Sequence, residues 1–184
     1  MNKAAALMIL IALSPSCGPS TLDRSGSAKV TFEDWVRACV AGDAPKVFNG
    51  MSDAYKSGWL FDRFDEADPT TRRWRGELTG EARTDLDLWL GVAKKRETGR
   101  ESILPISVLQ HPSLTGLFKE LFMKTYGGIK IQMSRIQIAQ VYSDDSGVTV
   151  AVKNSMSSTE LYGLVYERDG WKIDAHRQPL TQSR

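Results

Sequence analysis

The closing third of the chain contains the strongest folding signal, an Asp-Gly pair between two short segments of alternating hydrophobicity. The segments are residues 160–168 and 171–176, and Asp169-Gly170 separates them. An Asp-Gly pair suits a two-residue turn because both residues tolerate positive φ, and period-two alternation is typical of a half-buried strand. The sequence therefore predicts an antiparallel hairpin with Asp169-Gly170 as its loop.

This loop also predicts the hairpin register. Tyr166 would face Ile173, and Glu167 would face Lys172 as an opposite-charge pair across the strands. The predicted core face carries the apolar side chains Tyr162, Leu164, Tyr166, Trp171, Ile173 and Ala175. The opposite face carries Val165, Glu167, Lys172, Asp174 and His176.

Two further strands are predicted before the hairpin. Ile129, Ile131 and Met133 alternate with polar residues, and the alternation resumes at Ile136 and Ile138 after a slip at 134–135. That pattern indicates one long strand with a bulge. Residues 144–147 have the composition of a turn, and Val148, Val150 and Val152 form the next strand.

The residues before the strands have helical periodicity. Thr31 with Asp34 predicts the start of a first helix and Gly42 its end, while Asp43 and Ser52 can cap a second and a third helix. A helix is predicted over residues 79–95, and another from Leu114 to Gly127-Gly128. Residues 61–76 look charged and irregular, and residues 99–112 stay ambiguous because Pro105 interrupts their apolar run.

Helices first and antiparallel strands last predict an α+β fold, in which N-terminal helices pack on a C-terminal antiparallel sheet of about four strands. Residues 31–178 would form a single domain, and residues 179–184 a disordered tail.

The first seventeen residues combine a cationic start, an apolar run from Ala4 to Leu13, and Ser14-Pro15-Ser16-Cys17. The apolar run is shorter than the roughly 20 residues that span a bilayer. This arrangement resembles the signal peptide of bacterial lipoproteins, which implies that Cys17 carries fatty-acid chains such as palmitate. The mature protein would then be anchored in the cell envelope, facing the periplasm or the exterior.

The residues after Cys17 support such an anchor, because residues 18–30 are small, polar and rich in helix breakers, as in a flexible tether. Gly18 rather than Asp favours the outer membrane if the host has two membranes. The alternative is a secreted soluble protein, cleaved near Ser16 or Ser20 without lipidation.

The composition excludes several other classes of function. The apolar share is 41%, the charged share is 25% and the net charge is +2, with acids and bases interspersed, so no nucleic-acid partner is expected. Of two cysteines, only Cys39 belongs to the predicted domain. Its helical spacing from Trp35 places it on an apolar stripe, which predicts a buried and unreactive thiol.

A capped helix reading FEDWVRACVAGD, a short helix after its Gly-Asp, and a closing run with Gly-Trp-Lys-Ile resemble the nuclear-transport-factor-2-like superfamily. The resemblance covers residues 31–51 and 129–178 and implies a curved sheet wrapped against helices as a cone. Members that resemble this chain include bacterial lipoproteins of unknown function. The family usually has a strand hairpin where residues 52–95 look helical here, so the middle segment 52–112 either covers the cone mouth or replaces part of the fold.

Enzymes that resemble this fold place an acidic base beside Tyr or His inside the cone. The candidates here are Asp174 and His176, with Tyr162 and Tyr166 as polar aromatic partners. The predicted hairpin places the tyrosines on one face and Asp174 and His176 on the other, so a catalytic cluster is not expected. Tyr162 and Tyr166 remain candidate ligand-binding residues.

Metal and cofactor sites are not expected either. The two histidines are far apart in sequence, no cysteine pair accompanies them, and no phosphate-binding glycine loop occurs. The cluster Arg72-Arg73-Trp74-Arg75 could bind an anion, but its acidic neighbours favour a salt-bridged, solvated face. Trp74 is its candidate ligand-binding residue.

Three functions remain after these exclusions, of which the last is a purely structural role of the domain through its charged middle segment. The first is a membrane-anchored lipoprotein whose non-catalytic, cone-like domain binds an envelope protein or a small apolar ligand. The second is a cone-fold lyase or isomerase that acts on a small metabolite through Asp174 or His176.

Overall fold

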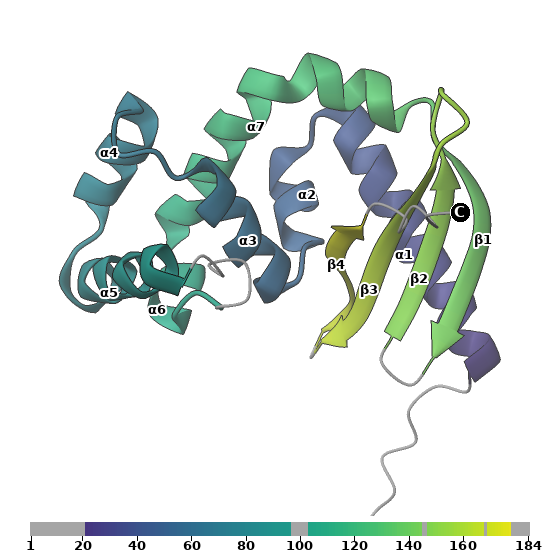
Figure 1. Cartoon of the computed structure of the whole chain (residues 1–184), viewed down its shortest axis with the longest axis horizontal. Coiled ribbons are helices and arrows are strands. Elements are labelled where there is room, and N and C mark those ends of the chain that lie inside the picture. The colour runs from purple at the N-terminus through teal and green to yellow at the C-terminus, as the bar shows by residue number, and fades with distance from the viewer. Residues whose placement is uncertain (1–20, 97–102, 145–146, 168, 178–184) are drawn as a thin grey trace, which may run out of the picture.

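The computed structural model describes residues 21–96, 103–144, 147–167 and 169–177, and in these ranges the chain forms seven helices followed by four strands (Figure 1). The predicted α+β class and helix-then-strand order are confirmed. The predicted signal peptide with Cys17, residues 18–20 of the tether, and the tail 179–184 lie outside the described residues.

The helices are α1 (Thr21–Ala41), α2 (Ala44–Asn49), α3 (Asp53–Arg63), α4 (Pro69–Glu77), α5 (Gly80–Arg96), α6 (Ile106–Leu109) and α7 (Pro112–Met133). The strands are β1 (Gln137–Asp144), β2 (Gly147–Lys153), β3 (Thr159–Glu167) and β4 (Gly170–Arg177).

The four strands form one antiparallel sheet in the order β1-β2-β3-β4. The pairing shifts between Ile138 and Gln140 in β1 and again between Gly163 and Leu164 in β3. At the free side of β4, the amide of Ile173 donates to the carbonyl of Gly50 (2.8 Å), and the amide of Ser52 donates back to the carbonyl of Ile173 (2.8 Å). The loop between α2 and α3 therefore continues the sheet and protects this edge.

The predicted hairpin exists, but its predicted register is wrong. Glu167 pairs with Gly170, and Lys172 pairs with Val165 rather than with Glu167. The Lys172 ammonium instead donates to the carbonyl of Asn49 and to the carboxylate of Asp169, both at 2.9 Å. The cross-strand charge pair does not form because Glu167 lies opposite Gly170 in this register.

The predicted core face of the hairpin is correct at most described positions and wrong at Tyr166. Ile173, Leu164 and Tyr162 are at most 1% exposed, whereas Tyr166 is 61% exposed. Tyr166 makes an edge-on contact with the Trp171 ring, at 5.4 Å between centroids. It lies beside Trp171 at the end of the hairpin, on an open groove that it shares with Ile106 of α6.

The strand predicted over residues 129–138 is also wrong, because α7 continues through Gly127-Gly128 to Met133 and β1 begins at Gln137. Ile129 and Met133 are four residues apart, which suits one face of a helix as well as alternate positions of a strand. Met133 is buried and Ile131 is 56% exposed. Packing of the apolar helix face overrides the low helix propensity of the two glycines.

Helix α1 begins ten residues earlier than predicted. Thr31 lies inside the helix, where its hydroxyl donates to the carbonyl of Ser27 (3.1 Å), so it is not the cap. Residues 21–30, expected as tether, are helical and contribute to the core: Ala28 is buried, and the Trp171 indole donates to the Ser27 hydroxyl (2.9 Å).

The region predicted as irregular contains helix α4, which follows the cap residue Asp68. The Asp68 carboxylate accepts from the amide of Thr70 (2.6 Å), and Pro69 occupies the first turn, as suits a helix start. This amide and the Lys124 ammonium hold the pKa of Asp68 below its usual value. The predicted caps Asp43 and Ser52 and the predicted end at Gly42 are confirmed.

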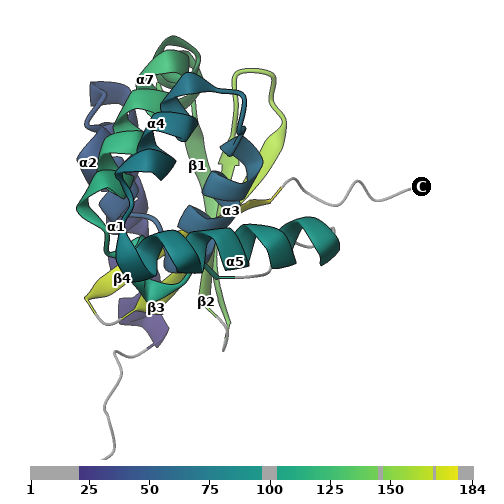
Figure 2. The same cartoon turned by 90° about the vertical axis from the view of Figure 1, so that its left-hand side faces the viewer.

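Helix α1 covers one face of the sheet, and α7 runs from α6 across α2 toward the sheet (Figures 1 and 2). Helices α4, α5 and α6 lie at the end of the molecule away from β1 (Figure 1). The core between α1 and the sheet is aromatic, since the Phe32 ring lies 5.0 Å from the Tyr162 ring and 6.3 Å from the Trp35 ring.

The glycine after α1 offers a test of this packing. Gly42 has φ +74°, and a Cβ there would lie 3.0 Å from the Tyr126 ring. We expect Gly42→Ala to lower the free energy of unfolding by about 1–3 kcal/mol, because alanine is strained at positive φ. Gly116→Ala, at an open helical position of α7, should raise it by about 0.5–1 kcal/mol. Urea denaturation measures both, and equal effects of the two substitutions would contradict this geometry.

Candidate functional site

A pocket of about 220 Å³ lies between the sheet and the helices α1, α2, α3 and α7. Helix α1 contributes Trp35 and Cys39, which share a face because they are four residues apart. Val47 of α2, Met51 and Tyr162 of β3 line it too. The Trp35 indole donates to the carbonyl of Val47 (3.1 Å), which fixes this wall.

Helix α3 contributes a row of three side chains at intervals of four residues: Tyr55, Trp59 and Arg63. This spacing places all three on one face of the helix. The Arg63 guanidinium lies over the Trp59 ring, at 5.4 Å from its centroid. Ser52 orients the helix, because its hydroxyl accepts from the amide of Tyr55 (3.0 Å).

Helix α7 closes the pocket with a longer row of side chains: Phe118, Phe122, Ile129, Gln132 and Met133. The Phe118 ring contacts the rings of Trp59 (4.7 Å), Phe48 (4.9 Å) and Phe122 (5.5 Å). Part of this row exists only because α7 continues past its two glycines. The pocket therefore depends on a helical segment that the sequence pattern placed in a strand.

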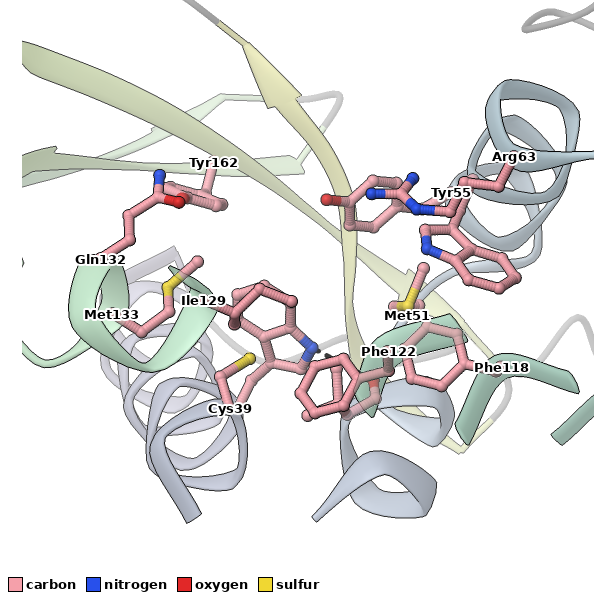
Figure 3. A pocket seen from close by; sticks show the side chains of 13 residues that line it. Cys39, Met51, Tyr55, Arg63, Phe118, Phe122, Ile129, Gln132, Met133 and Tyr162 are labelled. Carbon is pink, nitrogen blue, oxygen red and sulfur yellow. Dashed lines mark hydrogen bonds between the residues drawn. The ribbon is translucent and has the colours of Figure 1, made fainter. Parts of the chain in front are cut away.

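The polar groups of the pocket lie on two opposite sides. Figure 3 shows Gln132 and Tyr162 on one side and Tyr55 with Arg63 on the other, with Ile129 and Cys39 between them. The Tyr162 hydroxyl donates to the carboxylate of Glu160 (3.3 Å). Burial raises the pKa of both tyrosines, so each hydroxyl stays protonated and able to donate at neutral pH.

Cys39 is 1% exposed in the pocket wall, as the helical spacing predicted. Burial raises the pKa of its thiol to about 12, because desolvation penalises the thiolate. A thiol is neutral when protonated, so a raised pKa means less thiolate at any given pH. The site offers no activated cysteine nucleophile.

Cys39 should therefore react slowly with 5,5′-dithiobis-(2-nitrobenzoate). With a pKa of about 12, roughly one thiol in 10,000 is ionised at pH 8. In a Cys17→Ser background, we expect a rate at least about 100-fold below that of the same chain in guanidinium chloride. Equal rates in the folded and unfolded chain would contradict the burial of this thiol.

Of the candidate ligand-binding residues from the sequence, only Tyr162 lines this pocket. Tyr166 lies on an open groove beside Ile106 and Lys172. Trp74 is buried at 3% exposure in α4 and contacts the Phe64 ring (6.4 Å), and its indole nitrogen has no hydrogen-bond partner among the described residues. The structure does not bring these three candidates together.

The candidate catalytic residues do not reach the pocket where the structure describes them. The Asp174 carboxylate accepts from the Ser52 hydroxyl (2.7 Å), and Asp174 does not line the pocket. The backbone of His176 pairs with Tyr162 across the strands, but the His176 side chain lies outside the described part. Asp174 therefore supports the start of α3 through Ser52.

The arginine cluster of α4 is salt-bridged, as its acidic neighbours suggested. The Arg73 guanidinium contacts the Glu120 carboxylate (2.5 Å), and Arg75 contacts Asp87 (2.8 Å). Arg72 donates to the carbonyl of Ala67 (3.0 Å). The ion pairs join α4 to α7 through Arg73 and to α5 through Arg75.

Within the described ranges, no group of three or more His, Cys, Asp or Glu side chains is arranged to hold a metal ion. No described helix is both long and apolar enough to cross a membrane.

Sequence reasoning missed the residues of α3 that line the pocket. Tyr55, Trp59 and Arg63 recur at intervals of four, and this regular spacing was the available signal. This spacing was not recognised because Arg63 lies near the start of residues 61–76, the segment that was predicted to be irregular.

No family model matches the sequence, and neither the curated proteins nor the solved structures contain a significant match to it.

Proposed function

We propose that this protein is an envelope lipoprotein whose domain binds a small apolar molecule in the pocket between the sheet and α1, α3 and α7. The observation that carries the proposal is the composition of the pocket wall. Aromatic, aliphatic and sulfur-containing side chains dominate it, and a few polar groups lie at opposite sides. Such walls are typical of small-molecule sites.

The size of the pocket limits the ligand. A cavity of about 150 Å³ accepts a benzene molecule, and this pocket measures about 220 Å³. The ligand is therefore a single-ring or short branched group rather than a long acyl chain. The proposal places the sheet and helices in a cone of the nuclear-transport-factor-2-like type, with the ligand enclosed between them.

The proposal is for binding without catalysis. None of the side chains that line the pocket is an aspartate, glutamate or histidine, and Cys39 keeps its proton. General acid–base chemistry needs a group that titrates near neutral pH. The N-terminal anchor is part of the same proposal, resting on the lipoprotein-like residues 1–17.

Binding of 4-tert-butylbenzyl alcohol to the full chain tests the proposal by isothermal titration calorimetry. For a ligand of this size we expect a dissociation constant between about 0.01 and 1 mM. Gln132→Trp should weaken binding at least about tenfold, because the indole would fill the side of the pocket that Gln132 lines. Ile131→Trp is the matched control, since Ile131 neighbours it on α7 but does not line the pocket.

Binding that is unaffected by Gln132→Trp, or lost equally in both variants, would contradict the proposed site. Circular dichroism and thermal unfolding of both variants show whether α7 is intact, so that a loss of binding is not confused with a loss of fold.

A further inference from the structure

The charges of the pocket wall are uneven. Arg63 is the one side chain with a formal charge among the residues that line it. The nearest acidic groups on the same elements are Asp62 on α3 and Glu160 on β3, and neither lines the pocket. A ligand in the pocket would therefore contact one positively charged side chain, that of Arg63.

The Arg63 guanidinium has no carboxylate within ion-pair distance in the described part of the chain. Other described arginines differ in this respect; Arg73 and Arg75, for example, contact Glu120 and Asp87. Arg63 instead lies over the face of Trp59. A contact with a ring face leaves the N–H donors of a guanidinium, which lie in its own plane, available for other partners.

The Tyr55 hydroxyl lies on the same side of the pocket as Arg63 (Figure 3) and also has no hydrogen-bond partner among the described residues. Arg63 and Tyr55 come from the same face of α3, two turns apart. A guanidinium and a neutral phenol on one side of a pocket can both donate to an oxyanion. Gln132 adds an amide donor from the opposite side (Figure 3).

We propose that the ligand of this pocket is an amphipathic anion, with its apolar ring or branched group against Phe118, Phe122 and Ile129 and its carboxylate on Arg63 and Tyr55. This inference rests on the proposed function and adds the charge of the ligand to it. The pocket selects against cations, because Arg63 would repel them and no acidic side chain lines the wall.

Three probes that share one apolar body test the charge preference: 4-tert-butylbenzoate, 4-tert-butylbenzyl alcohol and 4-tert-butylbenzylamine. Titration calorimetry with the full chain at low salt should give the tightest binding for the carboxylate. We expect it to bind about tenfold more tightly than the alcohol, and the amine to bind weakest. The advantage of the carboxylate should shrink as salt is added, because the Arg63 guanidinium is partly solvated.

Arg63→Gln should remove the advantage of the carboxylate over the alcohol, so that the two probes bind within about threefold of each other. Tyr55→Phe should reduce the advantage by a smaller factor. Lys119→Gln is the matched control, because it removes one positive charge from an exposed position of α7 that does not line the pocket. It should leave the order of the three probes unchanged.

The two proposals fail in different ways. If the alcohol binds as tightly as the carboxylate, or if Lys119→Gln lowers the preference as much as Arg63→Gln, the charge inference is wrong while the apolar site stands. If no probe binds the full chain, both proposals are wrong.

Discussion

Replacing Phe32 with alanine is expected to lower the free energy of unfolding by about 3–5 kcal/mol, the range for large-to-small substitutions in a packed core. Phe32 is 0% exposed and its ring lies against Tyr162 and Trp35. It connects α1 to the sheet at the centre of the core, so its loss leaves a cavity that the rigid strands cannot fill. Urea denaturation with a linear extrapolation measures the change.

Tyr166→Ala is the matched control for this substitution. Tyr166 is another aromatic residue, predicted for the same core but 61% exposed, so its loss should cost no more than about 1 kcal/mol. A Tyr166 effect as large as that of Phe32 would contradict the observed exposure of Tyr166 and would support the predicted core face.

The second large effect is expected from Phe118→Ala. Phe118 is 2% exposed and contacts three rings, including Trp59. Its removal should cost about 3–5 kcal/mol. Because Phe118 also lines the pocket, the space of the lost ring should join the pocket and enlarge it.

This enlargement gives Phe118→Ala a second readout. An apolar ligand that binds only the folded state restores stability by RT ln(1 + [L]/Kd), which is about 1.4 kcal/mol at ten times Kd. Benzene should therefore stabilise Phe118→Ala measurably more than the unchanged chain in thermal unfolding. Met123→Ala, at a position on α7 that is 48% exposed, should show neither the loss nor the rescue. A Phe118 variant that loses stability but gains nothing from benzene would place the ring away from the pocket.

The order of elements was predictable because it depends on local patterns. The caps Asp43 and Ser52 accept from backbone amides, and Gly42 ends α1 at positive φ, all of which short-range chemistry dictates. The alternating valines of β2 likewise specify a strand with one buried face.

The errors arise where tertiary contacts decide between two readings of one pattern. Ile129 and Met133 fit both a strand and a helix, and packing beside Phe122 against the core selects the helix. In the hairpin, Lys172 pairs with Val165 and its ammonium contacts the α2 carbonyl of Asn49 instead of Glu167. No local sequence pattern predicts either contact.

The pocket was less predictable than the fold, because its wall combines residues from five elements. Cys39 and Tyr162 were recognised as buried or ligand-facing, yet Arg63 looked like part of a charged loop. The proposed role of Arg63 depends on the absence of a carboxylate partner within the described residues. The sequence alone does not indicate this absence, because acidic residues such as Asp62 are its neighbours.

The most direct test of the central claim is a measurement of nuclear Overhauser effects between bound 4-tert-butylbenzoate and the methyl groups of the ¹³C-methyl-labelled full chain. The account predicts contacts from the tert-butyl group to the methyls of Ile129, Met51 and Met133, which line the pocket. Contacts confined to exposed methyls such as those of Ile131 and Met156 would show that the ligand binds elsewhere, and would contradict the account.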